Sequence, residues 1–461
     1  MNRALPLLIV LALSCVATPL RAEPPRVLRA TPDHGDIGVD PALAEIRVMF
    51  DQDMLADRSV CGGGATFPRL TAQPVWKSPR ELAIPVMLEP GHRYDISINC
   101  SSFGNFRSVT GEVCEITPIS FVTAAAGAAA PALPALTPEA NAAALTSLLD
   151  AIDRRYSYRD RVVKSWPAAF DPWRPAITSA TTPATFARAV ARALREAKDP
   201  HLALAVNHAV FPTFSPHARP NADAALLAKL VPRFEKANAI VAFGLFDDGI
   251  AYIQINGWPG DASLLEPAHE FLTGHTDAAG IILDVRTNGG GDELSARRFA
   301  ARFVSEKTVY SRSRVRDPSR DGGWTPLMER AVSPGDAVPA GSGAAPHPCR
   351  APVAVLVGPA CMSSNESFIL MMKHGAKATL VGAPTFGTSG NPRPVDLGNG
   401  VTARIPTWED QLPDGTVLEG RGVAPDVSAE FRGGGADAVL EAARRFLASE
   451  PHAAGDVKQT K

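Results

Sequence analysis

The amino-acid sequence predicts a multidomain protein with an N-terminal all-β sandwich, a small helical lead-in and an α/β core built on a mostly parallel sheet. Three patterns indicate this architecture. Apolar residues alternate with polar ones before residue 123, two helix-start signals occur between residues 137 and 200, and buried strands alternate with helices after residue 238. A chain of 461 residues has room for about two to four domains of ordinary size.

The first 22 residues have the features of a secretory signal. Arg3 supplies the positive start, residues 5–16 form the apolar run, and Ala22 ends the cleavage zone with a small residue. The run is short for crossing a bilayer, and no later stretch approaches about 18 apolar residues. We therefore expect an exported protein, periplasmic or extracellular, with no membrane span after signal removal. A retained N-terminal anchor is the alternative.

Composition and cysteine usage limit the partners. The chain is 45% hydrophobic and 20% charged, with a net charge of -2, so no basic excess points to nucleic acid. Five cysteines follow the signal, three of them before residue 123. Export implies an oxidising compartment, so we expect one disulfide in that region, with Cys100–Cys114 as the favoured pair. The cysteine spacings match no metal site, and we expect neither a metal nor a cofactor.

Residues 23–123 are expected to form the all-β module. Alternating apolar positions predict its strands, over residues 44–50, 82–88, 94–100 and 119–123. Residues 124–136 are rich in Ala and Pro, which is typical of a semi-stiff linker.

Residues 137–237 form the predicted helical lead-in. Thr137-Pro138-Glu139 combines a capping residue, a proline in the first turn and an acid at the positive end of a helix. Thr182-Pro183 starts a second helix in a similar way, and Asp199-Pro200 ends it.

Residues 238–448 form the predicted α/β core, and residues 449–461 are an expected disordered tail. Buried strands are predicted over residues 250–255, 280–285 and 352–357. Helices are predicted over residues 262–273, over 293–304 and from 364 onward. Strands that alternate with helices favour parallel pairing through right-handed crossovers.

The segment 284–291 is the first candidate site, because a buried strand ends there in three consecutive glycines. Such a loop can bring backbone N–H groups close to a ligand, so an oxyanion hole is one interpretation. A phosphate loop is the second, although its lysine and its glycine spacing are missing. A tight turn without a chemical role is the third.

Ser363, His201 and Glu419 are candidate catalytic residues. Ser363 lies between a buried strand and a helix, where a serine is often a cap. At the same place the helix dipole and the next backbone N–H would stabilise an oxyanion formed on attack by the serine. His201 directly follows a predicted helix end, where a side chain can be held facing a cleft. Glu419 follows a predicted hairpin turn and could be the carboxylate that orients an imidazole.

Four segments, taken in order, resemble the tail-specific, or C-terminal-processing, serine peptidase family: the glycine segment at 284–291, Ser363 to Glu366, Gly382 to Gly387, and Gly420 to Asp426. The resemblance covers residues 138–430. It implies a core of the ClpP/crotonase-like fold and polypeptide substrates. The order of turns and strands in residues 23–123 likewise resembles bacterial Ig-like domains.

The resemblance also assigns roles residue by residue. It makes Ser363 the nucleophile and Glu366 the acidic member of the same segment. The backbone N–H groups of Gly289, Gly290 and Ser364 would form the oxyanion hole.

The chain departs from the family at the residue that acts as the general base. Many members carry a lysine just after the Thr-Phe-Gly segment, where this sequence has Thr388. A second branch of the family, similar to the tricorn protease core, uses a histidine from before the α/β core, and His201 matches that position. The carboxylate partner of that histidine maps onto Glu419. The resemblance therefore implies a Ser363–His201–Glu419 site, in which His201 activates the serine hydroxyl.

Two rival functions are compatible with the same residues. A non-catalytic binding protein for a peptide or an apolar ligand could use the same fold, because fold does not fix function. Such a protein is not expected to keep the serine, the histidine, the glutamate and the glycine pair together. An esterase could use the same three side chains, and a comparison of peptide with ester substrates separates it from a peptidase.

Overall fold

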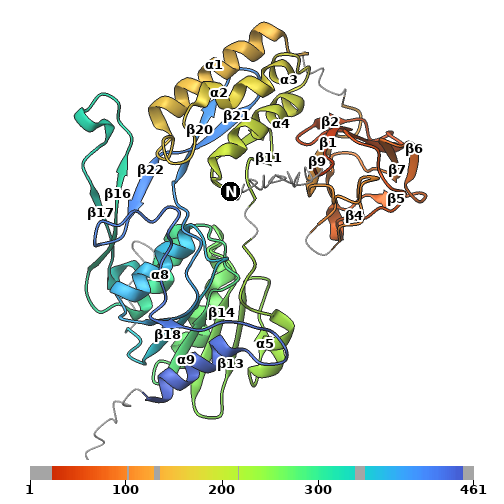
Figure 1. Ribbon diagram of the computed structural model, residues 1–461. Helices are drawn as coiled ribbons and strands as arrows, with labels where there is room; N and C mark the ends of the chain where they lie inside the picture. The colour runs from red at the N-terminus through yellow and green to blue at the C-terminus, as the bar shows by residue number, and fades with distance from the viewer. Residues whose placement is uncertain (1–22, 101–102, 129–134, 216–217, 338–347, 450–461) are drawn as a thin grey trace, which may run out of the picture. The chain divides into compact units, whose positions relative to one another are not determined.

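A computed structural model describes residues 23–100, 103–128, 135–215, 218–337 and 348–449 (Figure 1). The chain divides into two compact units. The first holds the residues up to Pro134 together with Asn207–Ala209, and the second holds the rest. The predicted signal at 1–22, part of the predicted linker and nearly all of the predicted tail lie outside the described residues.

The first unit is β-rich, as the sequence predicts. Its strands are β1 Val27–Thr31, β2 Ile37–Val39, β3 Glu45–Phe50, β4 Val60–Cys61, β5 Arg69–Leu70, β6 Val75–Ser78, β7 Glu81–Met87, β8 Arg93–Ile98 and β9 Thr117–Thr123. One sheet has the order β1-β3-β7-β5, with β6 also paired to β7, and the other has the order β2-β9-β8-β4. In β3 the side chains of Ile46, Val48 and Phe50 are fully buried. The residues between them are exposed or half-buried, which is the alternation expected of a strand with one face on a core.

The cysteines of the first unit differ from the expected pairing. The Cys100 thiol is hydrogen-bonded to the thiol of Cys61, and burial raises the pKa of Cys61 to about 11. Cys114 instead lies in the apolar core at 2% exposure, and burial raises its pKa to about 12. The structure therefore brings Cys61, rather than Cys114, to Cys100. Cys61 lies on strand β4 and is adjacent to Cys100 only through the pairing of β4 with β8.

The second unit is built on a seven-stranded sheet. Its strands are β12 Glu235–Lys236, β13 Val241–Leu245, β14 Ile250–Ile255, β15 Gly280–Asp284, β18 Val353–Val357, β19 Thr379–Gly382 and β23 Val427–Ser428, in that spatial order. Neighbours from β14 to β23 pair in parallel, and the pairs from β12 to β14 are antiparallel. The central strands are buried along their whole length, as parallel strands covered on both faces are. This confirms the predicted α/β core with a mostly parallel sheet.

Helices cover both faces of this sheet (Figure 1). They are α5 Ala224–Leu230, α6 Glu266–Thr273, α7 Glu293–Ala300, α8 Ser364–His374 and α9 Ala438–Ser449. One apolar core contains side chains from α6, α7 and α8, and a separate core on the opposite face contains side chains from α5 and α9. Helices α7 and α8 begin directly after the loops that follow β15 and β18. Both loops therefore lie at the carboxyl edge of the sheet, where sites of parallel sheets form.

The lead-in contains strands that the sequence analysis did not anticipate. Its helices are α1 Pro138–Arg155, α2 Trp166–Phe170, α3 Arg174–Thr178 and α4 Pro183–Leu194. They pack on a four-stranded sheet formed, in order, by β11 Ala209–Pro212, β10 Ala203–Val206, β21 Thr402–Pro406 and β20 Pro392–Asp396. The last two strands come from the segment assigned to the α/β core. The lead-in is therefore an α+β layer completed by a distant hairpin.

A third sheet in the second unit has the order β17-β16-β22. Its strands are β16 Thr308–Val315, β17 Met328–Val332 and β22 Trp408–Gln411. β22 follows β21 closely in the chain, so a single segment links the lead-in sheet to this third sheet. Trp408 and Asp410 alternate with Glu409 along β22, which places them on the opposite face of the strand from Glu409.

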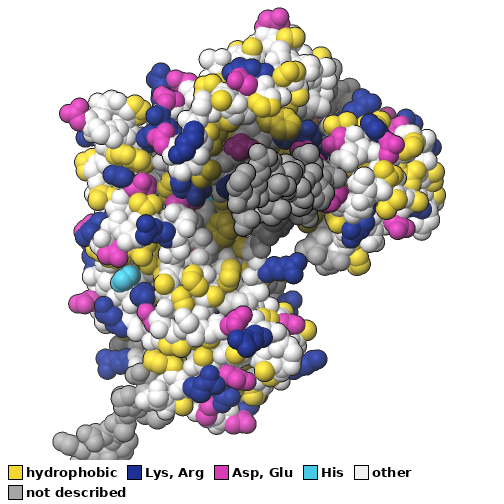
Figure 2. All heavy atoms as spheres, in the orientation of Figure 1, with side chains coloured by type: hydrophobic (Ala, Val, Ile, Leu, Met, Phe, Trp, Pro, Cys, Tyr) yellow, Lys and Arg dark blue, Asp and Glu magenta, His cyan; other side chains and the backbone are white. Residues whose placement is uncertain are grey.

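The described surface carries charges of both signs. On the face shown in Figure 2, Lys and Arg side chains are interspersed with Asp and Glu side chains. A nucleic-acid-binding surface would instead gather basic side chains along one face. Among the described helices, none has the length and apolar character to cross a membrane.

Candidate active site

Ser363 sits at the start of helix α8 in an unusual backbone conformation. Its φ of 56° and ψ of -129° lie outside the regions that residues with a side chain ordinarily occupy, and such conformations persist only where surrounding contacts impose them. Two acceptors hold its backbone N–H, the Thr388 carbonyl at 3.1 Å and Glu366 Oε2 at 3.2 Å. The side chain of Ser363 is therefore presented by a fixed backbone.

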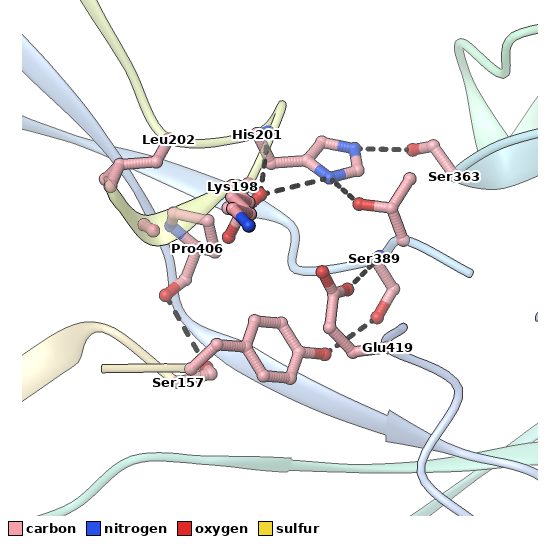
Figure 3. Close-up of polar contacts among 12 residues, drawn as sticks. Ser157, Lys198, His201, Leu202, Ser363, Ser389, Pro406 and Glu419 are labelled. Atoms are coloured by element: carbon pink, nitrogen blue, oxygen red, sulfur yellow. Dashed lines mark hydrogen bonds and ion pairs between the residues drawn. The ribbon is translucent and has the colours of Figure 1, made fainter. Parts of the chain in front are cut away.

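His201 meets Ser363, although the two residues lie 162 positions apart in the chain. His201 Nε2 is 3.0 Å from Ser363 Oγ (Figure 3). On the other side of the ring, Nδ1 is 3.0 Å from Thr388 Oγ1. The imidazole is thus held between two hydroxyl groups, and 17% of the His201 side chain is exposed.

Asp199 lies beneath the imidazole and is fully buried. Its Oδ1 accepts a hydrogen bond from the backbone N–H of His201 at 2.8 Å and lies 4.0 Å from Nδ1 of the ring. Its Oδ2 accepts a hydrogen bond from Tyr156 Oη at 2.9 Å. Burial lowers the pKa of His201, and the negative charge of Asp199 opposes that shift. Burial also raises the pKa of Asp199. The imidazole is consequently neutral at neutral pH, as a general base must be.

Glu419 does not take the place expected from the sequence. Its Oε2 accepts a hydrogen bond from the backbone N–H of Ser389 at 2.8 Å, and its Oε1 lies 3.7 Å from Arg161. In Figure 3 the Glu419 carboxylate points toward Ser389 rather than toward the imidazole. Burial, followed by the nearby charge of Asp199, raises the pKa of Glu419. The predicted contact between Glu419 and His201 is therefore replaced by contacts of the ring with Thr388 and Asp199.

A local signal could have identified Asp199. Asp side chains often accept a hydrogen bond from the backbone N–H two residues later, and Asp199 does this with His201. The carboxylate that stabilises the histidine loop is thus encoded two positions before the histidine. Thr388 was noted only as the residue at the position of the family lysine, and its sequence gives no sign that its hydroxyl reaches His201.

The three residues predicted to form the oxyanion hole have different environments. Within the described residues, the backbone N–H groups of Gly289 and Ser364 have no hydrogen-bond acceptor. The N–H of Gly290 instead donates to Asn288 Oδ1 at 2.9 Å. A Cβ on Gly290 would come within 2.9 Å of both the Ser363 Cβ and the Met362 carbonyl oxygen. Gly290 therefore makes room for the serine, and the predicted role of its N–H as a donor does not fit this geometry.

Glu366 joins the serine loop to the neighbouring loop at 385–388. One carboxylate oxygen accepts hydrogen bonds from Thr385 Oγ1 and the backbone N–H of Gly387, and the other accepts from the backbone N–H groups of Thr388 and Ser363. The side chain is completely buried. Burial raises the pKa of Glu366 to about 7, although its four donors lower it. Glu366 therefore fixes the positions of both Ser363 and Thr388.

These groups have the arrangement required for acyl transfer. A hydroxyl lies beside a neutral imidazole at the N-terminal, positive end of α8. The N–H groups of Ser364, at the same helix end, and of Gly289, in the glycine loop, have no acceptor among the described residues. In the part of the chain that the structure describes, no group of three His, Cys, Asp or Glu side chains is placed to hold a metal ion.

Residues 249–429 match the sequence profile of peptidase family S41. The matched range contains the glycine loop, Ser363 and Thr388, and it begins after His201. No curated protein sequence matches the chain.

Solved structures are similar to this chain to different degrees. A candidate peptidase from Parabacteroides merdae superposes with a TM-score of 0.56 and 21% identity, over 68% of this chain and 98% of that chain. A lipoprotein from Streptococcus agalactiae has a TM-score of 0.44 and 15% identity, over 68% of this chain and 98% of that chain. The tricorn protease has a TM-score of 0.43 and 12% identity, over 89% of this chain and 54% of that chain. Residues 249–429 of the second unit are therefore similar to peptidase family S41, and the Parabacteroides merdae structure shares the fold of this chain.

Proposed function

We propose that this protein is an exported serine endopeptidase with Ser363 as its nucleophile and His201 as its general base. The observation that carries the proposal is the 3.0 Å distance between Ser363 Oγ and His201 Nε2. A serine hydroxyl is a weak nucleophile until a neighbouring base accepts its proton. His201 is at the right distance and, because its pKa is lowered by burial, in the right protonation state to be that base.

Thr388 and Asp199 select the tautomer that this role requires. When Nδ1 of His201 donates its proton to Thr388 Oγ1, Nε2 is left free to accept the proton of Ser363. The Asp199 carboxylate, 4.0 Å from Nδ1, then stabilises the imidazolium that forms on attack. In this proposal Asp199 replaces Glu419 as the carboxylate that supports the histidine, and Glu419 holds the adjacent backbone at Ser389.

The reaction then follows from these positions. Ser363 Oγ bonds to the scissile carbonyl carbon while its proton moves to His201 Nε2. The negative charge that develops on the carbonyl oxygen is stabilised by the N–H groups of Ser364 and Gly289. His201 gives the proton to the leaving amine as the C–N bond breaks. A water molecule repeats the sequence on the acyl-enzyme, releases the carboxylic acid and restores Ser363.

Export and the identity of the first unit are parts of the same proposal. The charged start, apolar run and small terminal residue of segment 1–22 support removal of a signal and activity in the periplasm or outside the cell. The two sheets of the first unit, antiparallel except for the β2–β9 pair and sharing one apolar core, support an Ig-like sandwich. The N-terminus of the secreted protein, determined by mass spectrometry, should lie near residue 23, whereas an intact N-terminus would indicate a retained anchor.

The purified chain from residue 23 onward provides the test of the activity. It should cleave an unfolded protein such as reduced and alkylated casein, and the Ser363→Ala variant should not. Matched peptide amides and esters should both be hydrolysed by the wild type. Hydrolysis of esters alone would favour an esterase. Tight peptide binding without hydrolysis, by a protein with a native circular dichroism spectrum, would favour the binding protein.

A further inference from the structure

A pocket of about 290 Å³ opens directly beside the proposed nucleophile. Its lining residues include Ser363 and Ser364 together with Glu293, Trp408 and Asp410. Its volume is roughly ten times the ~30 Å³ that a water molecule occupies in the liquid. The pocket can therefore hold a long side chain.

Two residues that line the pocket each have a buried polar atom without a hydrogen-bond partner. Asp410 Oδ1 and Trp408 Nε1 are buried, and neither has a hydrogen-bond partner within the described residues. Asp410 as a whole is only 1% exposed. A buried carboxylate oxygen without a donor is costly, and in a binding site a ligand that supplies the donor removes that cost.

The charges around the pocket leave a negative excess. Asp292, Glu293 and Asp410 line it, and no Lys or Arg is among its described lining residues. Arg330, which is not one of the lining residues, binds Asp410 Oδ2 and Glu293 Oε2. The second oxygen of Glu293 accepts a hydrogen bond from Tyr310. Arg330 therefore serves both carboxylates and leaves Asp410 Oδ1 unsatisfied. Burial raises the pKa of Asp410, and the attraction of Arg330 opposes that shift.

The lining residues of the pocket indicate which part of a bound substrate it would hold. It contains Ser363 and Ser364, whose hydroxyl and N–H would meet the carbonyl carbon and the carbonyl oxygen. His201, which must reach the leaving amine, is not among its lining residues. The pocket thus lies on the acyl side, where the residue that provides the scissile carbonyl places its side chain.

We propose that this pocket selects substrates whose scissile carbonyl belongs to a lysine or arginine residue, with Asp410 as the residue that recognises the cation. The proposal rests on the proposed function and adds the substrate class. A basic side chain would donate to Asp410 Oδ1, offset the negative excess and stack on Trp408, whose ring already lies 4.5 Å from the guanidinium carbon of Arg330.

Matched substrates test the proposal without altering the protein. Two fluorogenic peptides would differ only in lysine or acetyl-lysine before the scissile bond, and a second pair would carry arginine or citrulline. We expect kcat/KM to be about 10- to 100-fold higher for the charged member of each pair, as for the loss of a charge-assisted hydrogen bond. Equal values within each pair would overturn the proposal.

A matched pair of variants assigns the selectivity to Asp410. Asp410→Asn should bring the lysine to acetyl-lysine ratio of kcat/KM close to one. Glu409→Gln should leave that ratio unchanged, because Glu409 is adjacent on β22 but pairs with Arg314 and does not line the pocket. An unchanged ratio in a folded Asp410→Asn protein would contradict the assignment. Because the readout is a ratio, a general loss of activity in Asp410→Asn does not affect it.

Binding separates failure of this inference from failure of the proposed function. The Ser363→Ala variant should bind the lysine peptide more tightly than the acetyl-lysine peptide when measured by fluorescence anisotropy. If the wild type hydrolyses no peptide but the Ser363→Ala variant shows this preference, the proposed activity is wrong and the pocket assignment is supported. If peptides are cleaved and neither readout distinguishes the two, only the pocket assignment is wrong.

Discussion

The two halves of the site are held in different ways. The serine half belongs to the α/β core, where one buried carboxylate, that of Glu366, holds the backbone N–H groups of Ser363 and of Gly387 and Thr388 in the neighbouring loop. The histidine half belongs to the lead-in, where single side-chain contacts with Thr388 and Asp199 position the ring. The nucleophile is thus part of a rigid backbone frame, and the base depends on a few adjustable side chains.

This difference indicates which substitutions affect chemistry and which affect structure. Removing the imidazole of His201 or the hydroxyl of Thr388 should change the reaction and spare the fold. Removing Glu366 should change both, because buried backbone donors lose their acceptor. The predictions below use this contrast, beginning with the largest expected effect.

Replacing the base should have the largest effect on activity. His201→Ala should lower kcat/KM by about 10⁴-fold or more, and adding Ser363→Ala should lower it little further, because the two residues act as a unit. The unfolding midpoint in urea should change little. His374→Ala, at the far end of α8, is the matched control and should retain activity. Comparable activity in His201→Ala would show that another group is the base.

Removing the central carboxylate of the serine half should reduce both activity and stability. Glu366→Ala leaves the N–H groups of Gly387 and Thr388 without their buried acceptor and removes one of the two acceptors of the Ser363 N–H. We therefore expect a loss of about 2–4 kcal/mol in the free energy of unfolding. We also expect kcat/KM to fall by about 10²-fold, because the serine is displaced by a fraction of an ångström. The loss in free energy should exceed that of Glu419→Ala, which removes the acceptor of one backbone N–H, that of Ser389, and a 3.7 Å contact with Arg161. If Glu366→Ala lost less free energy of unfolding than Glu419→Ala, the proposed role of Glu366 in holding the serine loop would be contradicted.

Removing the hydroxyl beside Nδ1 should have a moderate effect confined to catalysis. Thr388→Val keeps the shape of the side chain but removes the acceptor for Nδ1–H, so kcat should fall about 10-fold with little change in KM. Thr388→Ser should restore most of the rate. If Thr388→Ser is as slow as Thr388→Val, the hydroxyl is not the group that matters.

The pH profile should show the smallest but most specific effect. The neutral imidazole is the active form, and burial lowers the pKa of His201 from its usual value near 6.5. Activity should therefore be lost as the pH falls, with the midpoint of the acid limb of kcat/KM below pH 6.5. Asp199 favours the protonated ring, so Asp199→Asn should move that midpoint to still lower pH. A shift toward higher pH would contradict the role assigned to Asp199.

The sequence was most informative where local patterns decide the structure. Period-two alternation located β3 and β7, and buried strands followed by helices predicted the parallel sheet. The helix signal at Thr182 was correct because a capping box forms there. The sequence did not indicate that β20 and β21 complete the lead-in sheet, since that pairing joins segments nearly 200 residues apart and depends on tertiary packing.

The residues of the candidate site also fall into those that local motifs predicted and those that only the tertiary structure could identify. Ser363 and His201 were proposed from motifs and the structure brings them together, whereas the carboxylate beside the ring depended on side-chain geometry. Glu419 and Asp199 are both buried carboxylates near the site, and only the fold determines that Asp199 is the one 4.0 Å from Nδ1. Likewise, spacing could not show that the N–H of Gly290 is already bound to Asn288.

Labelling with a fluorophosphonate, followed by intact mass and peptide mapping, tests most directly whether Ser363 is activated by His201. The wild-type protein should gain one adduct, on Ser363. Ser363→Ala should gain none, and His201→Ala should react at least about 100-fold more slowly, because its serine lacks a base. An adduct on a different residue, or labelling of His201→Ala at the wild-type rate, would contradict the assignment of nucleophile and base.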